Sequence, residues 1–306
     1  MTDSRKNSET TTSNLSSDVH LLPAAARIKR RILGHKSFLI GGSLVAFFLL
    51  IAILAPWVMP KDPFHQDLTL RMINPFWHVD GNWDHLLGTD QVGRDYLSRL
   101  IYGTRISLLV GFSSILISGL IGSFFGILSG YFGGRLGAFI NFLITVRLSM
   151  PMILVALAVV SLFRGSFTVV ILVLGFTLWE RFAVVLRAAT QQIRSSDYVA
   201  AADAAGCSTS RIILSELLPN VLNPLIIVAT VDIARAILAE AALSFLGMGV
   251  QPPIPSWGLM VNEGKNFMFF HPWMIVLPGA CIFILVLAMN MLGDGIRDIT
   301  SPEAKS

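Results

Sequence analysis

Long apolar blocks separated by short polar segments make up most of this chain. Each block has about 20 residues or somewhat more, which is the length that an α-helix needs to cross a hydrocarbon core of roughly 30 Å. The blocks run over residues 38–59, 107–130, 137–163, 167–187, 223–246 and 272–292. This pattern predicts an all-α polytopic membrane protein with six transmembrane helices.

The polar segments predict how the rest of the chain is organised around these helices. We expect a polar N-terminal segment (1–37), a first loop with an amphipathic helix (60–106), a helical core (107–293) that contains a polar segment (195–220), and a tail (294–306). Within the first loop, the helix is expected over 85–105, entering the second span.

Basic residues before the first block predict the orientation in the membrane. They are Arg27, Lys29, Arg30, Arg31 and Lys36. Because positively charged flanks remain on the cytoplasmic side, we predict cytoplasmic N- and C-termini. The polar segment 195–220 is then also cytoplasmic, and the first loop lies outside.

Composition narrows the class of protein further. Hydrophobic residues make up 54% of the 306-residue chain and charged residues 14%, with a mean hydropathy of +0.68. A soluble domain would carry about a quarter charged residues. The basic cluster also lacks the interleaved aromatic residues of a nucleic-acid-binding surface. We therefore expect contact with membrane lipid and none with nucleic acid.

Side chains that carry catalysis or bind metals are not grouped in the sequence. Cys207 and Cys281 fall at different levels of the predicted topology, and the six histidines have no paired ligand spacing. No G-x-x-x-x-G-K-[ST] phosphate-binding motif is present in the sequence. We expect no metal, no cofactor and no catalytic residues in this chain. If ATP drives it, partner subunits must bind the ATP and Mg²⁺.

The polar segment between the fourth and fifth blocks carries the most specific pattern. It reads YVAAADAAGCSTSRIILSELLP, from Tyr198 to Pro219. An alanine-rich helix is expected before Gly206, and a second short helix with an apolar stripe is expected to end at Pro219. Two interpretations remain open: a docking element for a soluble partner, or an amphipathic helix on the membrane surface.

Ionisable residues inside the predicted spans are a second functional signal. Asp232 and Arg235 lie on one helix face near the middle of the fifth span, and Glu240 lies about two turns further along. Each such group costs about 2.5–3.5 kcal/mol at the bilayer centre unless it is paired or hydrated. The alternatives are an internal Asp232–Arg235 pair, or a pathway surface that meets a charged solute such as the termini of a peptide.

Two other charged positions in the spans have structural interpretations. Arg147 lies one turn before Pro151, which frees a backbone carbonyl. We expect Arg147 to bind exposed carbonyl oxygens, and the alternative is that it reaches the cytoplasmic interface. Glu180 and Arg181 are adjacent in the fourth span, point to different faces, and need separate partners. Ser and Thr side chains within the spans are expected to hydrogen-bond between helices.

Three stretches together resemble the permeases of ABC importers. The segment 198–219 resembles their cytoplasmic EAA loop, with Ala201, Ala202 and Gly206 at the matching positions and Leu218–Pro219 at its end. Residues 85–111 (HLLGTDQVGRDYLSRLIYGTRISLLVG) and 237–258 (ILAEAALSFLGMGVQPPIPSWG), with the later NMLGDGIRD, resemble the dipeptide/oligopeptide branch. The match covers most of the chain from about Leu86 onward and is closest to the second permease subunit of such importers.

The resemblance is incomplete at four positions. The Glu of the EAA pattern falls at Ala200, and a usually basic position falls at Asp203. A frequent Arg and Asp before Pro151 fall at Phe142 and Thr145. Loss of the Glu argues against its usual salt bridge to an ATPase, whereas the small-residue face and the glycine remain.

The resemblance implies a type I ABC importer permease in the bacterial inner membrane. It would move short peptides by alternating access, with a second permease subunit, two ATP-binding subunits and a periplasmic solute-binding protein. The residues implied in coupling to the ATPases are Ala201, Ala202, Asp203, Gly206, Ile212, Leu218 and Pro219. Other substrates of the family, such as nickel chelates, and a different class, an ion-gradient-driven secondary transporter with Asp232, Arg235 and Glu240 as a proton relay, remain alternatives.

Overall fold

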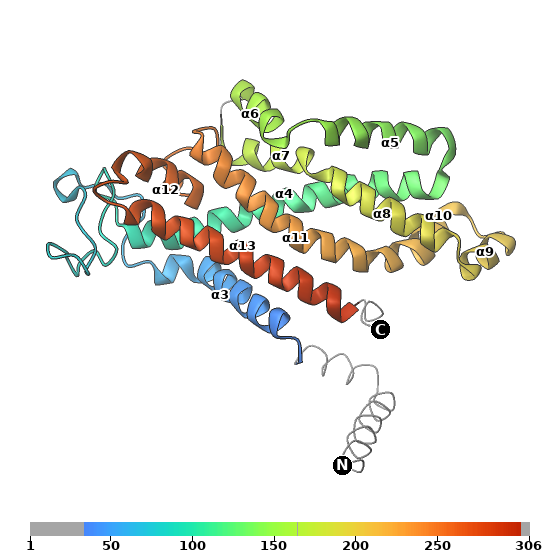
Figure 1. The fold of residues 1–306 in the computed structure, drawn as a ribbon, viewed down its shortest axis with the longest axis horizontal. Helices are drawn as coiled ribbons and strands as arrows, with labels where there is room; N and C mark the ends of the chain where they lie inside the picture. Colours follow the sequence, from blue (N-terminus) through green and yellow to red (C-terminus); the bar gives the residue numbers. More distant parts are fainter. Residues whose placement is uncertain (1–33, 164, 301–306) are drawn as a thin grey trace, which may run out of the picture.

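The structure is a computed structural model that describes residues 34–163 and 165–300 (Figure 1). Within these ranges, five helices are long and apolar enough to cross a membrane, and a bent helix pair makes a sixth possible. The prediction of an all-helical polytopic protein is therefore confirmed. Arg27, Lys29, Arg30 and Arg31, on which the predicted orientation depends, lie outside the described residues.

The helices follow the predicted blocks closely but extend beyond several of them. The spanning elements are α3 (Lys36–Val58), α4 (Tyr96–Phe132), the pair α5 (Gly134–Ser149) and α6 (Met152–Phe163), α7 (Phe167–Thr177) with α8 (Trp179–Arg194), α11 (Leu218–Phe245) and α13 (Trp273–Thr300). Short elements connect them: η1 (Leu68–Leu70), α9 (Asp197–Ala204), α10 (Thr209–Arg211), η2 (Ile212–Leu217), α12 (Trp257–Gly264) and η3 (Lys265–Phe267). Helix α13 continues to Thr300, so part of the expected tail is helical.

The third span is not the single helix that the apolar block 137–163 predicts. Helices α5 and α6 meet at an angle of 87° around Met150 and Pro151. Proline has no backbone N–H and its ring clashes with the preceding turn, so the helix ends before it. Arg147 donates hydrogen bonds to the carbonyl oxygens of Met150 (3.3 Å) and Thr177 (2.6 Å), which confirms its expected role.

Helix α4 is the central helix, since it packs against α3, α5, α7, α8, α11 and α12. Its contact with α8 depends on small residues spaced four apart, Gly122, Gly126 and Gly130, which are all buried. Above them, Ser118 Oγ donates a hydrogen bond of 2.7 Å to the carbonyl oxygen of Gly175 on α7. Small residues allow helix backbones to approach closely where hydrophobic forces cannot drive association.

The first loop contains less helix than the sequence pattern predicts. Residues 85–95 form turns, and the helix begins only at Tyr96, after which it runs unbroken into the second span. Gly88 and Gly93 have φ angles of 76° and 78°, which a helix does not allow. The Asp95 carboxylate then accepts a hydrogen bond of 2.8 Å from the Ser98 backbone N–H and caps the first turn.

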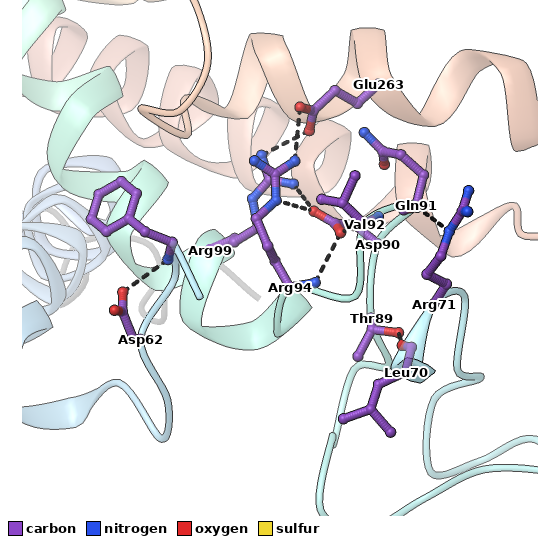
Figure 2. A network of polar contacts seen from close by, with 11 residues as sticks. Asp62, Leu70, Arg71, Thr89, Asp90, Gln91, Val92, Arg94, Arg99 and Glu263 are labelled. Carbon is purple, nitrogen blue, oxygen red and sulfur yellow. Dashed lines mark hydrogen bonds and ion pairs between the residues drawn. The ribbon is translucent and has the colours of Figure 1, made fainter. Parts of the chain in front are cut away.

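A buried ionic network joins this loop to α4 and α12 (Figure 2). Arg94 contacts Asp90 at 2.6 Å and Glu263 at 3.1 Å, and Arg99 contacts Glu263 at 2.7 Å and also pairs with Asp90. Two positive and two negative charges therefore balance. Because Asp90 and Arg99 are fully buried, removing one partner would leave an uncompensated charge. The network holds the loop rigidly against the helix ends.

Candidate functional site

The polar segment between α8 and α11 forms a compact projection at one end of the molecule. In Figure 1, α9 and α10 lie at the end of the long axis opposite to the first loop and α12. The start of α3 and the end of α13 lie toward the same end as α9, and the ring of His35 contacts the Asp298 carboxylate at 3.0 Å. The first loop and the polar segment therefore lie at opposite ends of the helical bundle.

Helix α9 ends in a well-formed C-terminal cap. The backbone N–H of Gly206 donates to the Asp203 carbonyl (2.9 Å), and that of Cys207 donates to the Ala202 carbonyl (3.1 Å). Gly206 has a φ angle of 76°, in the left-handed region that this cap requires. The predicted helix break at Gly206 is confirmed, and its reason is backbone conformation.

The second half of the segment does not end at Pro219, as the sequence pattern predicts. The helix that starts at Thr209 continues without interruption to Phe245. Between them, η2 is a π-helical turn in which the Leu218 N–H donates to the Ile213 carbonyl. Pro219 follows this π-helical turn directly, and the wider turn accommodates a residue that lacks a backbone N–H. The helix therefore connects the projection directly to the fifth span.

The apolar stripe of this second half faces the interior of the chain. Ile212 and Leu217 are buried, and Leu218 packs against a cluster of Ile127, Leu186 and Val221. Small or polar positions of α9 and its cap are exposed, namely Ala200, Ala201, Asp203, Ala204 and Gly206, and so are the larger side chains of Tyr198 and Leu214. Ala202 is half-buried. In this structure, the stripe anchors the projection to α4 and α8, and it is not free to lie on a membrane surface.

Asp232 lies at the centre of a charge cluster between α8 and α11. Its Oδ1 accepts hydrogen bonds from Arg181 (2.7 Å) and from Arg235 (3.2 Å). The internal Asp232–Arg235 pair is thus confirmed, whereas its second partner was not predicted. Asp232 is fully buried, but the side chains of Arg181 and Arg235 are 45% and 37% exposed. Arg181 pairs with Asp232, whereas Glu180 Oε2 is buried without a hydrogen-bond partner, so a separate partner for Glu180 stays a prediction.

Glu180 and Arg147 place this cluster beside the two helix breaks. Glu180 lies within electrostatic range of Arg147, Arg235 and Asp232. Arg147 binds carbonyl oxygens at both breaks, one at Met150 between α5 and α6 and one at Thr177 between α7 and α8. Glu180, Arg181, Asp232 and Arg235 therefore converge where the helical backbone is interrupted.

Glu240 does not belong to this cluster. Its Oε1 accepts hydrogen bonds from Ser244 (2.7 Å) and Ser256 (2.8 Å), and the side chain is buried. Ser256 is also the N-cap of α12, where its Oγ accepts from the Leu259 N–H. The structure therefore places Glu240 as a bridge between α11 and the start of α12, separate from Asp232 and Arg235.

Sequence reasoning missed Arg181 as a partner of Asp232 and the network of Asp90, Arg94, Arg99 and Glu263. The spacing of Asp90 and Arg94, four residues apart, is a signal that could have indicated their local pair. Nothing in the spacing pointed to Glu263. Within residues 34–163 and 165–300, no three or more His, Cys, Asp or Glu side chains are grouped to hold a metal ion.

Comparisons with known proteins agree with this arrangement. Residues 122–306 match the family described as "binding-protein-dependent transport system inner membrane component", and residues 25–75 match the "N-terminal TM domain of oligopeptide transport permease C". Similar relatives include the dipeptide transport system permease protein DppC of Haemophilus influenzae, 41% identical, and that of Escherichia coli, 40% identical. The alignments cover 89% of this chain in both cases, and 92% and 90% of these relatives.

Two further comparisons extend this result. The di/tripeptide transport system permease protein DppC of Pseudomonas aeruginosa is 40% identical over 89% of this chain and 90% of its own. Among solved structures, a chain of the MetNI methionine ABC transporter in an inward-facing conformation aligns with a TM-score of 0.56. That alignment covers 65% of this chain and 95% of the MetNI chain at 19% identity, so it shows a shared fold alone.

Proposed function

Because this chain belongs to the family of binding-protein-dependent inner-membrane transport components, we propose that it carries short peptides as the permease of an ATP-driven importer. Membership makes it a multi-pass permease of the inner membrane, with ATP hydrolysis in partner subunits and solute delivery by a binding protein. The alternative of an ion-gradient-driven secondary transporter is thereby excluded. Relatives named as dipeptide and di/tripeptide permeases, at about 40% identity, support a peptide as the solute.

The complete importer in this proposal has a second permease subunit, two ATP-binding subunits and a periplasmic binding protein. The projection formed by α9 and the start of the Thr209–Phe245 helix faces the cytoplasm, together with both chain termini. The first loop and α12 face the periplasm, where the binding protein docks. The separation of these two regions along the long axis supports placing them on opposite sides of the membrane (Figure 1).

The projection couples ATP hydrolysis to transport in this proposal. Ala201, Asp203 and Gly206 are exposed on it, so they are available to an ATPase groove. Ile212 and Leu218 support it from within, because they pack into the chain's own interior. Closure of the ATPases on ATP moves the projection, and the continuous helix Thr209–Phe245 transmits that motion into the membrane.

The single observation that carries the coupling role is the exposed alanine helix capped at Gly206 and joined to a spanning helix. A Cβ at Gly206 would meet no atom within 4 Å, so a substitution acts only through the backbone. Left-handed backbone costs an ordinary residue roughly 1–2 kcal/mol, and a β-branched residue more, whereas Asn tolerates it. Gly206→Val should change the angle between α9 and α11, and Gly206→Asn should preserve it.

The test uses the complete importer reconstituted in proteoliposomes with its ATPases, second permease and binding protein. We expect Gly206→Val to insert and assemble normally, to hydrolyse ATP, and to lose peptide uptake per ATP. Gly206→Asn should retain wild-type coupling. Normal coupled uptake by Gly206→Val would refute the role of this element. Absence of peptide uptake by the wild-type importer would refute the proposed substrate.

A further inference from the structure

We propose that Arg181 and Arg235 form a binding site for the carboxylate group of the transported solute, held in place by Asp232. This inference rests on the proposed function, since the carboxylate is taken to be the C-terminus of a short peptide. The first observation in its favour is the net charge of this group of side chains. Two guanidinium groups share one carboxylate oxygen, and Arg147 and Glu180 beside them add one formal charge of each sign, which leaves one net positive charge at the cluster.

The exposure of the three side chains shows where that charge is available. Asp232 is fully buried, while Arg181 is 45% exposed and Arg235 is 37% exposed. A guanidinium has five N–H donors, and within residues 34–163 and 165–300 each of these two donates only to Asp232. Donors therefore remain on both side chains for a ligand, whereas the buried carboxylate is inaccessible to one.

The depth of the cluster argues against lipid as its surroundings. Arg181 lies in the middle of the apolar helix Phe167–Arg194, and Arg235 lies well inside the helix Thr209–Phe245. An ionised side chain at such depth costs about 2.5–3.5 kcal/mol or more in hydrocarbon and normally faces a polar cavity or a partner. In this proposal, the exposed side of both arginines faces the aqueous pathway of the assembled importer.

The backbone around the cluster has the form of a transport site. Arg147 links the 87° break between α5 and α6 to the break between α7 and α8, and Glu180 beside it is within electrostatic range of Arg235. Interrupted helices near the middle of the membrane are common at the substrate sites of transporters, because they allow polar groups to face a cavity. In this chain, the two helix breaks and the two exposed arginines lie in the same region.

The geometry favours a single carboxylate as the ligand. The two donating nitrogens lie no more than about 6 Å apart, since both are within 3.2 Å of the same Asp232 oxygen. A carboxylate that bridges them would make charge-assisted hydrogen bonds to both guanidinium groups. Because Asp232 already neutralises one of the two charges, the net charge matches one monoanion. Binding would then be weak enough for the solute to be released.

The experiment measures binding without the solute-binding protein, which would otherwise select the ligand itself. The importer with both permeases and its ATPases, trapped with ATP in nanodiscs, is titrated with tritiated dialanine and with its C-terminal amide. We expect wild type to prefer dialanine. Arg181→Gln and Arg235→Gln should each weaken dialanine binding roughly tenfold or more, and should leave the weak binding of the amide unchanged.

Two control variants separate a binding role from a structural one. Arg187→Gln removes an arginine from the same helix that bonds to Asn141 outside the cluster, and it should bind dialanine as wild type does. Arg235→Lys retains the charge and should recover part of the affinity. Co-purification of the second permease and the ATPases reports assembly of each variant.

Each of the other possible results would refute the proposed carboxylate-binding site or the proposed function. If the Gln variants bind dialanine like wild type, or if wild type binds the acid and the amide equally, Arg181 and Arg235 do not hold a carboxylate. If the Gln variants lose the second permease, the arginines pair with that subunit instead. Peptide uptake by wild-type proteoliposomes is measured in parallel. Its absence refutes the peptide function, whereas its presence with unaffected variants refutes only the site.

Discussion

The close contact between α4 and α8 yields a sharp prediction at Gly126. A Cβ placed there would lie 2.9 Å from both the Ala183 carbonyl oxygen and the Leu186 Cβ. Ordinary contact begins near 3.4 Å, so Gly126→Ala requires the two helices to separate by about 0.5 Å. The Ala183 backbone cannot turn aside as a flexible side chain would, and the separation spreads along the interface.

The expected loss of stability in Gly126→Ala is that of adding a methyl group to an interior that is already closely packed. Extra methyl groups in such sites cost typically 1–3 kcal/mol, while replacing Gly by Ala in a helix gains about 1 kcal/mol in helix propensity. Gly119 provides the matched control on the same helix, because a Cβ there would lie 3.6 Å from Phe182 Cε1, an ordinary contact. Gly119→Ala has the same propensity gain without the clash.

The assay is thermal unfolding of the purified importer in detergent, followed by intrinsic fluorescence. We expect Gly126→Ala to unfold at a lower temperature than Gly119→Ala, by about 2–4 °C for each kcal/mol. Because α8 carries Arg181, the clash also displaces one side of the Asp232 cluster. Equal unfolding temperatures for the two variants would show that the α4–α8 interface is loose and that its glycines do not set the helix separation.

Three further predictions follow from other contacts. Arg99→Leu should destabilise the importer by about 3–5 kcal/mol because Arg94 alone cannot balance both Asp90 and Glu263, so one buried negative charge is left uncompensated. Arg71→Leu, at an exposed position, should have little effect, and chemical denaturation measures both. Gly41→Ala should lower the unfolding temperature, because a Cβ at Gly41 would lie 2.6 Å from a backbone nitrogen of α13. Gly42→Ala should not lower it, because the nearest atom to a Cβ at Gly42 is 3.7 Å away. Glu240→Gln should retain peptide uptake, because the amide oxygen can still accept hydrogen bonds from the two serines that contact Glu240.

Each of these expectations has a result that contradicts it. Equal denaturation midpoints for Arg99→Leu and Arg71→Leu would mean that the buried network adds no stability. Equal unfolding temperatures for Gly41→Ala and Gly42→Ala would show that α3 and α13 do not approach each other closely at Gly41. Loss of uptake in Glu240→Gln, with the subunits still assembled, would return Glu240 to the transport pathway as an ionised group.

Much of the fold could be predicted because the length of each apolar block can be read from the local sequence alone. Each block of about 20 apolar residues can satisfy its backbone polar groups in the membrane only as a helix. The break at Gly206 and the carbonyl contacts of Arg147 were also accessible, because glycine and proline act on the backbone within one turn. The same local reasoning was wrong at Pro219, where the helix does not end but continues through a π-helical turn.

The site itself depended on contacts between distant parts of the chain. The i,i+3 spacing of Asp232 and Arg235 predicted their pairing, but Arg181 reaches Asp232 from 51 residues away and Glu263 reaches Arg99 from 164 away. Helical periodicity places a side chain on a face, and only the packing of the helices decides which faces meet. For the same reason, the glycines of α4 determine a helix separation that no single segment encodes.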